Sequence, residues 1–400
     1  MGQFAAMQLL KNRQNACFGQ FCNATEPFSK NLYTENHMEN YGIYVHIPFC
    51  KARCGYCAFC SCVDLSLREA YFQTLFDEIR QAKNHGKIGS VYIGGGTPSA
   101  VGEQYLNRLF AELRAKFTFA DDCEITVECN PESVTQSLAE SLAQNGVNRV
   151  SLGLQSVNNA TLKKIGRLHT FDEFCVALDA LRFAGITNVN ADLILGLPES
   201  QNDFLRSVQT VAELPLSHVS VYALELYPDA PLNRFRDEIC ADQDALADMY
   251  DSAVATFAEY GFFRYETSNF AKDGKRCRHN LNYWQEGRYY GFGAAASGFE
   301  QNTRYTHVAD AQGYIDCPSK TCREQISLEE QAKEFVMLGL RLDDGIDLWE
   351  FSRRYNADFF DFFDQARRLL QQGFLAVVGN SVVIPSDKTY VANSVLAELL

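Results

Sequence analysis

The sequence has no long apolar run, no excess of positive charge and no recognisable export signal. No stretch approaches the ~18 consecutive apolar residues of a membrane span. The N-terminus lacks an apolar core followed by a small-residue cleavage site. Lys and Arg total 36 against 50 Asp and Glu, which gives a formal net charge of -14. A general nucleic-acid binder would carry a basic patch, so we expect a cytoplasmic chain that is not integral to a membrane and has no nucleic-acid partner.

What the chain does have is an alternation of short apolar strands with amphipathic helices between residues 41 and 270. Helices of roughly 10–15 residues between strands predict βαβ units and a parallel sheet. Six units are too few for a closed eight-stranded barrel, so they predict an α/β fold that is either an open, partial barrel or a doubly wound sheet. The strands are expected at residues 42–47, 90–93, 124–129, 149–153, 188–194 and 218–224.

The 400-residue length leaves room for further units on either side of this region. Residues 328–400 contain helical patterns followed by a short β-hairpin, which predicts a C-terminal α+β domain, helical and winged-helix-like. Residues 271–327 are expected to link the two units.

Residues 1–40 are polar, show no hydrophobic period and are expected to form a disordered extension. Met38 lies three residues before the first strand, so a chain that begins there is expected to keep its melting temperature and its ligands. The alternative is an arm over the barrel mouth, in which Phe18, Phe21 and Phe28 cover the site.

Fourteen cysteines are present, and five of them crowd between Cys50 and Cys62. Cys50, Cys54 and Cys57 follow the first strand with the spacing C-x3-C-x2-C. Three thiolates from one loop can hold three irons of a [4Fe-4S] cluster, which leaves the fourth iron open to a small chelating ligand. Zinc is the alternative, and because it takes four tetrahedral ligands, Cys60 or Cys62 would have to supply the fourth.

Polar and glycine residues follow the ends of the other predicted strands, on the rim where α/β barrels place their chemistry. Taken singly, each of these residues is more often structural, but together they predict a ligand site. Consecutive glycines also allow a ligand to approach the backbone closely. The candidates are Gly95, Gly96, Thr97, Glu128, Gln155, Arg167 and Asp192.

Residues 44–57 begin Tyr-Val-His-Ile-Pro-Phe-Cys and end Tyr56-Cys57, and this segment resembles the radical S-adenosylmethionine (SAM) superfamily. The wider resemblance covers about residues 41–380 and is to the oxygen-independent coproporphyrinogen III oxidase-like family. Two features favour its haem chaperone HemW branch over the oxidases. Phe59 stands where the oxidases have a fourth cysteine, and residues 279–284, His-Asn-Leu-Asn-Tyr-Trp, match the H-N-x-x-Y-W motif of the chaperones.

This resemblance implies a partial (β/α)6 radical-SAM barrel with a [4Fe-4S] cluster on Cys50, Cys54 and Cys57. It also implies a haem site in which His279 ligates the iron, with Cys277 as an alternative thiolate ligand. The SAM contacts that it implies are Tyr44, Tyr56, Gly95, Gly96, Thr97, Glu128, Gln155, Arg167 and Asp192. The haem contacts that it implies are His279, Asn280, Tyr283 and Trp284.

The function that the resemblance implies is a haem chaperone, which binds haem and passes it to an acceptor such as a membrane respiratory protein. An electron donor for the cluster is a further expected partner. The alternative is an oxygen-independent coproporphyrinogen III oxidase (dehydrogenase) that uses SAM radical chemistry in porphyrin biosynthesis. A radical SAM enzyme with an unrelated substrate is a third possibility.

Overall fold

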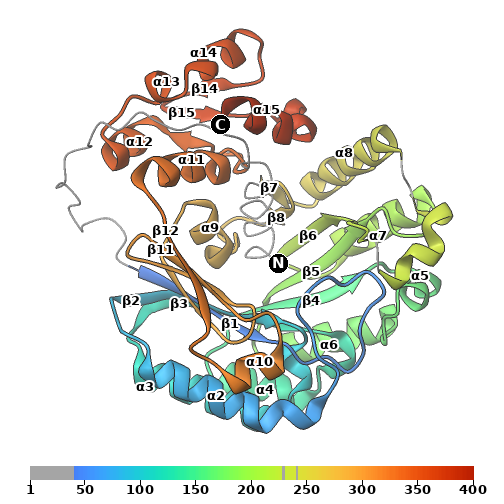
Figure 1. The fold of residues 1–400 in the computed structure, drawn as a ribbon. Coiled ribbons are helices and arrows are strands. Elements are labelled where there is room, and N and C mark those ends of the chain that lie inside the picture. The colour runs from blue at the N-terminus through green and yellow to red at the C-terminus, as the bar shows by residue number, and fades with distance from the viewer. Residues whose placement is uncertain (1–39, 228–229, 240–241) are drawn as a thin grey trace.

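Six parallel strands form the centre of the computed structural model, which describes residues 40–227, 230–239 and 242–400 (Figure 1). Each strand pairs in parallel with the next one along the chain. Because β1 and β6 are not neighbours in the sheet, the barrel is open, and the predicted partial (β/α)6 barrel is confirmed. The strands are β1 (Asn40–Ile47), β2 (Lys87–Gly95), β3 (Phe119–Cys129), β4 (Arg149–Gln155), β5 (Asn188–Leu195) and β6 (His218–Ala223).

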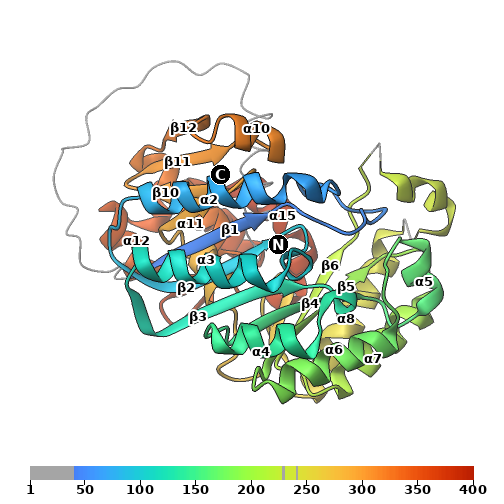
Figure 2. The same cartoon turned by 90° about the horizontal axis from the view of Figure 1, so that it is seen from below.

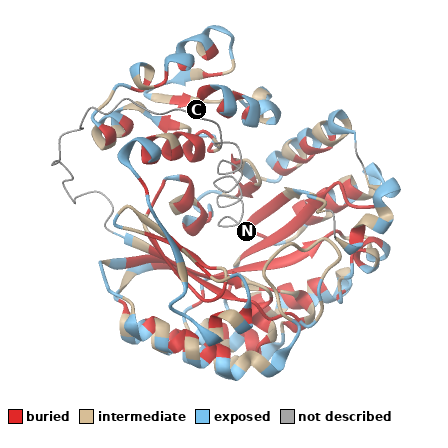
Figure 3. Ribbon diagram, in the orientation of Figure 1, coloured by how far each residue is buried: buried red, intermediate tan, exposed pale blue. Residues whose placement is uncertain are grey.

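Amphipathic helices cover the outer face of these strands. In α2 the residues Tyr71, Phe72, Leu75, Phe76 and Ile79 are buried, which is the stripe that a helix packed on a sheet requires. Figure 3 shows the same division between buried inner faces and exposed outer faces. The helices are α2 (Arg68–Gln81), α3 (Glu103–Lys116), α4 (Gln136–Gln144), α5 (Asn159–Lys164), α6 (Phe171–Phe183), α7 (Gln201–Glu213) and α8 (Gln243–Glu259).

Residues 271–327, which we expected to be a linker, continue the main sheet. Strand β9 pairs in parallel with β1, and the sheet runs on in the order β9-β10-β11-β12. At the other edge β8 and β7 follow β6. The elements between α8 and the C-terminal part are β7 (Phe263–Glu266), β8 (Asn269–Ala271), α9 (Arg278–Trp284), β9 (Tyr289–Phe292), β10 (Ser297–Glu300), β11 (Thr303–His307), α10 (Ala311–Asp316) and β12 (Thr321–Gln325).

The C-terminal part has its own apolar core, which includes Phe335, Phe351 and Val382. Its helices are accompanied by a three-stranded sheet in the order β13-β15-β14. Strands β14 and β15 form the predicted hairpin, and β13 is an additional strand paired with β15. Trp284 of α9 packs against Leu338 of α11 and joins this part to the barrel. The elements are α11 (Leu328–Gly339), β13 (Ile346–Asp347), α12 (Leu348–Tyr355), α13 (Phe359–Phe362), α14 (Asp364–Gln371), β14 (Ala376–Val378), β15 (Ser381–Val383) and α15 (Ala392–Leu399).

The predicted N-terminal extension lies outside the described residues, apart from Asn40, which opens β1. The choice between a disordered tail and an arm over the barrel is therefore still a sequence-based expectation. Within the described ranges, no helix combines the length and apolar character that a bilayer crossing requires.

Candidate functional site

The cysteine loop leaves β1 and is tied by backbone hydrogen bonds to itself and to two distant segments. The Cys50 N–H donates to the Cys62 carbonyl at 2.9 Å, which closes the loop. The Gly55 N–H donates to the Ile165 carbonyl at 2.9 Å, and the Leu232 N–H donates to the Gly55 carbonyl at 3.0 Å. These bonds hold the loop between the end of α5 and the short helix η4 (Pro231–Glu238).

One pocket at the carboxyl ends of the parallel strands brings together nearly all of the predicted cluster and SAM residues. Asn130, Ser151 and Gly153 also line it, and the sequence analysis missed them. Asn130 could have been predicted as a site residue, because it stands two residues after Glu128 at the end of the same strand. The predicted residues in the lining are Cys50, Cys54, Tyr56, Cys57, Gly95, Gly96, Thr97, Glu128, Gln155, Arg167 and Asp192.

Tyr44 is the predicted SAM contact that does not line this pocket. Its hydroxyl is hydrogen-bonded to His46 Nδ1 at 3.0 Å, and His46 Nε2 is 2.9 Å from the Cys60 carbonyl oxygen. Because a carbonyl oxygen only accepts, His46 carries its proton on Nε2 and accepts from Tyr44 at Nδ1. Tyr44 therefore supports the cysteine loop through His46.

The glycines after β2 are required by close packing against the cysteine loop. A Cβ on Gly96 would lie 2.7 Å from the backbone carbon of Pro48, and one on Gly95 would lie 2.6 Å from the His46 ring. Gly95 also has a φ of +114°, which other residues rarely adopt. Its N–H donates to Glu128 Oε2 at 3.0 Å. A larger residue at Gly95 would therefore disturb the loop as well as any ligand.

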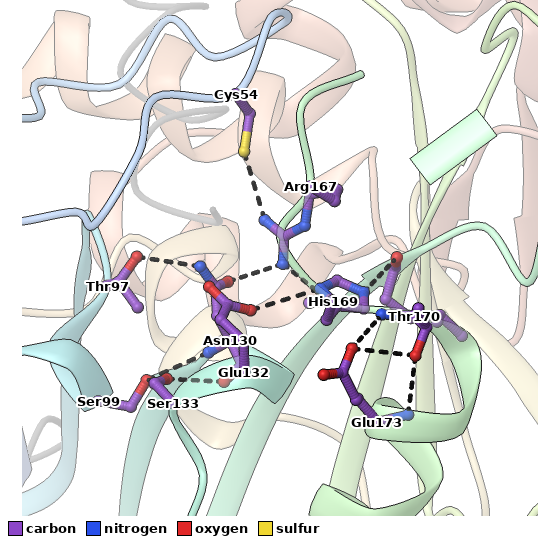
Figure 4. Close-up of polar contacts among 12 residues, drawn as sticks. Cys54, Thr97, Ser99, Asn130, Glu132, Ser133, Arg167, His169, Thr170 and Glu173 are labelled. Atoms are coloured by element: carbon purple, nitrogen blue, oxygen red, sulfur yellow. Dashed lines mark hydrogen bonds and ion pairs between the residues drawn. The ribbon is translucent and has the colours of Figure 1, made fainter. Parts of the chain in front are cut away.

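Arg167 crosses the pocket and joins the cysteine loop to the strand ends (Figure 4). Its Nη2 donates to Asn130 Oδ1 and to the Gly153 carbonyl, both at 2.8 Å, and its Nη1 is 3.5 Å from Cys54 Sγ. Burial alone would lower the pKa of this guanidinium, but Tyr56, Cys54 and other neighbours raise it above its usual value. Arg167 therefore carries a fixed positive charge beside the thiols.

Three buried polar atoms of pocket-lining residues have no hydrogen-bond partner among the described residues. They are Ser61 Oγ, Gln155 Oε1 and Arg167 Nε. Gln155 also has a φ of +76°, a strained conformation for a residue with a side chain, and such strain collects at ligand sites. A buried donor and a buried acceptor without partners are what a polar ligand would satisfy.

Two carboxylates, Asp192 and Glu128, also line the pocket. Asp192 accepts from Asn190 Nδ2 at 2.8 Å and from Ser151 Oγ at 3.2 Å. Burial, and then the nearby charge of Glu128, raise the pKa of Asp192. Glu128 Oε1 accepts from the Tyr92 hydroxyl at 2.8 Å. This pair suits a ligand that offers hydroxyl donors or a positive charge.

Neither Cys60 nor Cys62 supplies the fourth ligand that a zinc site would need. Cys60 Sγ donates to the Ala309 carbonyl at 2.7 Å, and Cys62 Sγ is 3.8 Å from the Asp64 carbonyl. Neither residue lines the pocket. Over the described ranges, no three His, Cys, Asp or Glu side chains converge closely enough to hold a single ion. Of the five cysteines in the loop, only Cys50, Cys54 and Cys57 line the pocket.

The predicted haem residues lie in α9, none of them lines this pocket, and all four are buried. His279 Nδ1 is 2.8 Å from Ser90 Oγ, and His279 Nε2 is 2.8 Å from the Tyr283 hydroxyl. Burial lowers the pKa of His279 to about 3. Because both ring nitrogens are engaged, the ring offers no electron pair to an iron in this conformation. Asn280 lies on the same helix, and Trp284 packs against the C-terminal part.

Comparison with known proteins agrees with this arrangement of residues. The family profile described as Radical SAM superfamily matches residues 44–211, and that described as HemN C-terminal domain matches residues 326–385. A protein named Heme chaperone HemW from Lactococcus lactis is 35% identical over 341 residues, which cover 83% of this chain and 90% of that protein. Its namesake from Mycobacterium tuberculosis is 33% identical, with 90% of this chain and 95% of that protein covered.

The chain belongs to the HemW family of the radical SAM superfamily. A solved structure of coproporphyrinogen III oxidase, HemN, from Escherichia coli covers 90% of each chain with a TM-score of 0.79 and 21% identity, which shows a shared fold. Membership of the superfamily brings with it a [4Fe-4S] cluster and SAM.

The residues of this HemW-family chain fit both cofactors. Cys50, Cys54 and Cys57 would hold the cluster, because they line one pocket from a single loop. Cys129 also lines the pocket, but it is buried at the end of β3. Burial raises the pKa of Cys57 to about 11, so a bound metal is needed to keep that sulfur as a thiolate. The unpartnered Gln155 Oε1 and Arg167 Nε, together with Asp192, offer the acceptors and the donor that a SAM molecule could use.

Replacing Asp192 with Asn is expected to weaken SAM binding while the iron content stays unchanged. The substitution keeps the shape of the side chain but removes its charge, which costs on the order of 1.5–3 kcal/mol for a charge-assisted hydrogen bond, or roughly 10–150-fold in affinity. Calorimetric titration with SAM measures the change. Asp179→Asn, on the outer face of α6, is the matched control. Equal SAM affinity in both variants would show that Asp192 does not contact the cofactor.

Proposed function

We propose that this chain is a haem chaperone, a radical-SAM-type protein that binds haem and transfers it to an acceptor protein. The observation that carries the proposal is the relationship to proteins named Heme chaperone HemW, at 33–35% identity over 83–90% of the chain. The H-N-x-x-Y-W motif at residues 279–284 supports the same reading. A membrane respiratory protein as acceptor, an electron donor and a cytoplasmic location belong to this proposal.

The alternative is an oxygen-independent coproporphyrinogen III oxidase, and the likeness to HemN is the observation behind it. At 21% identity that likeness supports a common fold. Phe59 argues for the chaperone, because it stands where the oxidases have their fourth cysteine and lines the cluster pocket with a ring in place of a thiol.

The protein's own part in the chemistry is to bind and orient its cofactors. When bound, the cluster and SAM supply one-electron chemistry at the sulfonium. Cys50, Cys54 and Cys57 would hold the cluster, and Arg167 would place a positive charge beside it. Tyr56 would pack near the adenine of SAM, and the strand-end residues would contact its polar groups.

Haemin added to the purified, cluster-loaded protein is expected to give a shifted Soret band that saturates at one equivalent. A protein ligand to the iron changes the haem spectrum. In the same anaerobic samples, coproporphyrinogen III with SAM and a reductant is expected to yield no protoporphyrinogen. An unshifted Soret band together with protoporphyrinogen formation would establish the oxidase alternative and overturn the chaperone proposal.

A further inference from the structure

Four neighbouring strands bring the cysteine loop and three polar side chains to one part of the cluster pocket. Strands β1 to β4 lie side by side in that order (Figure 2). The cysteine loop follows β1, Thr97 follows β2, Asn130 follows β3, and Arg167 stands beyond β4, between α5 and α6. The three side chains line the pocket together with Cys50 and Cys54. Because parallel strands end on one rim, residues from four segments can form one network there.

Hydrogen bonds connect Cys50 to Cys54 through these three side chains. Thr97 Oγ1 donates to Cys50 Sγ at 3.4 Å and accepts from Asn130 Nδ2 at 3.1 Å. Asn130 Oδ1 accepts from Arg167 Nη2 at 2.8 Å, and Arg167 Nη1 donates to Cys54 Sγ at 3.5 Å. Figure 4 shows the part of this network from Thr97 to Cys54. Two of the three proposed cluster thiols therefore each accept one hydrogen bond from opposite ends of one network.

The direction of the hydrogen bonds in this network follows from Arg167, because a guanidinium can only donate. Its Nη2 faces the oxygen of the Asn130 amide, so the amide nitrogen faces Thr97. The Thr97 hydroxyl oxygen then accepts from Asn130, and its own proton is left for Cys50 Sγ. The position of Arg167 thereby fixes the hydrogen bond at Cys50, at the other end of the network.

The backbone of the middle residue, Asn130, is held on both sides. Its N–H donates to Ser99 Oγ at 3.2 Å, and its carbonyl accepts from Ser133 Oγ at 2.7 Å. Ser99 and Ser133 are buried and hydrogen-bonded to each other. The Thr97 N–H donates to the carbonyl of Phe49, the residue before the first cysteine of the loop, at 2.8 Å. The Asn130 and Thr97 side chains are therefore oriented by fixed backbone, as a site that is formed before its cofactor binds requires.

The turn that carries Arg167 is anchored as well. Its N–H donates to the Leu162 carbonyl at 2.9 Å. Two residues later, the buried His169 has Nε2 3.3 Å from the Leu154 carbonyl oxygen and Nδ1 3.4 Å from Glu132 (Figure 4). These contacts connect the turn to β4 and to the segment after β3, which also carries Asn130.

We propose that Thr97 and Asn130 are positioning residues of the cluster, which together with Arg167 keep one hydrogen bond on each of two cluster thiolates and so raise its reduction potential. Hydrogen bonds to the sulfur ligands stabilise the additional negative charge of a reduced cluster. The inference rests on the assignment of the cluster to Cys50 and Cys54 and goes beyond the haem chaperone proposal. It gives Thr97 and Arg167 a role that precedes the SAM contacts expected from the sequence.

The test is a potentiometric titration of the reconstituted full-length protein without SAM, in which absorbance follows the cluster. Thr97→Val keeps the shape of the side chain and removes its hydroxyl. At a fixed potential, loss of one hydrogen bond should lower the ratio of reduced to oxidised cluster roughly three- to tenfold, a midpoint shift of about -30 to -60 mV. Thr97→Ser keeps the hydroxyl and should stay near the unaltered protein. Thr187→Val, at an exposed position before β5, is the matched control.

Asn130→Asp tests the direction of the network. A carboxylate only accepts, so it would accept from Arg167 and from the Thr97 hydroxyl, whose proton would then turn away from Cys50. The midpoint potential should fall further than in Thr97→Val, because the substitution also adds a negative charge. In the Thr97→Val background no hydroxyl is left to turn, so the double variant should fall by less than the sum of the two single shifts. A change in charge alone would add fully.

Melting temperature and iron content confirm that each variant is folded and loaded. A midpoint potential in Thr97→Val equal to that of the unaltered protein, or an equal fall in Thr97→Ser, would overturn the inference, as would fully additive shifts in the double variant. If Asn130→Asp binds no iron, the comparison of Thr97→Val with Thr97→Ser decides. If Cys50→Ala keeps its cluster, the thiolate assignment and this inference fall together. The haemin titration uses none of these variants, so it tests the chaperone proposal separately.

Discussion

Alanine in place of Cys50, Cys54 or Cys57 is expected to abolish the broad iron–sulfur absorbance of anaerobically reconstituted protein. All three thiols reach the same pocket, and the other two cysteines of the loop lie outside it. With one thiolate removed, two loop thiolates remain for a cluster that needs three, and Cys129, which also lines the pocket, is buried at the end of β3 instead of lying in the loop. Iron and sulfide analysis should therefore fall from four of each per chain to near zero, because a [4Fe-4S] cluster binds as one unit.

The matched controls are Cys60→Ser and Cys62→Ser. Serine keeps a donor for the Ala309 carbonyl, which Cys60 now contacts, so these variants should retain most of their iron. If Cys60→Ser loses iron as completely as Cys54→Ala, a four-cysteine site would replace the three-thiol arrangement. Chains that bind no iron are also expected to lose SAM binding, since the open iron of the cluster is the SAM anchor in this proposal.

The barrel could be predicted from the sequence because its strands are buried and its helices are amphipathic. Each predicted strand was found, and the ends moved by a few residues where pairing extends beyond the apolar run, as in β3, which begins at Phe119. The strands β9–β12 were missed because they are short and mostly antiparallel, and β12 is largely exposed. Their place beside β1 depends on contacts between distant residues, which no local pattern encodes.

The sequence pattern of a helix cap was misleading at the start of α2, because a neighbouring side chain takes the capping position. Ser66 followed by Glu69 three residues later is the pattern of a helix N-cap, yet in the structure Asp64 caps the turn before α2 and accepts from the Ser66 N–H at 2.9 Å. A carboxylate is a stronger hydrogen-bond acceptor than a hydroxyl, which explains why Asp64 and not Ser66 is the cap.

The candidate site was predictable to the extent that its residues stand at strand ends. Parallel strands bring their carboxyl ends to one rim, so the strand-end positions gathered Glu128, Gln155 and Asp192 in one pocket. Tyr44 stands inside β1, and its side chain instead packs with Tyr92 and Cys277. For His279 the motif predicted an iron ligand, but only the fold shows Ser90 and Tyr283 on its two nitrogens.

The free energy of unfolding is expected to fall as the pH rises from about 5 to 8, because two buried carboxyl groups lose their protons. Burial raises the pKa of Glu266 and that of Glu286 to about 7 each. Both lie where the barrel meets the C-terminal part. The Asp343 N–H donates to the Tyr265 carbonyl beside Glu266 at 3.1 Å, and Glu286 accepts from the Tyr355 hydroxyl at 2.6 Å.

The direction of this pH dependence follows from the pKa values of the two carboxyl groups in the folded and the unfolded chain. An acid whose pKa is higher in the folded state binds its proton more tightly there, so its contribution to stability is full below the unfolded pKa near 4.5. That contribution is lost as the pH rises through about 7, where the folded protein must bury a charge. A difference of two to three pKa units corresponds to about 3 kcal/mol for each residue.

Glu266→Gln and Glu286→Gln should therefore be more stable than the unaltered protein at pH 8 and nearly equal to it at pH 5. The chain has two tryptophans. Trp349 is 64% exposed, whereas Trp284 is buried against α11, so in a Trp349→Phe background the fluorescence of Trp284 reports on this junction. Denaturant unfolding followed by Trp284 at several pH values gives the stability profile, and Glu140→Gln on the exposed side of α4 is the control. A profile that stays flat, or that keeps its slope in both Gln variants, would mean that these two carboxyl groups ionise in the folded protein without cost and do not set its pH dependence.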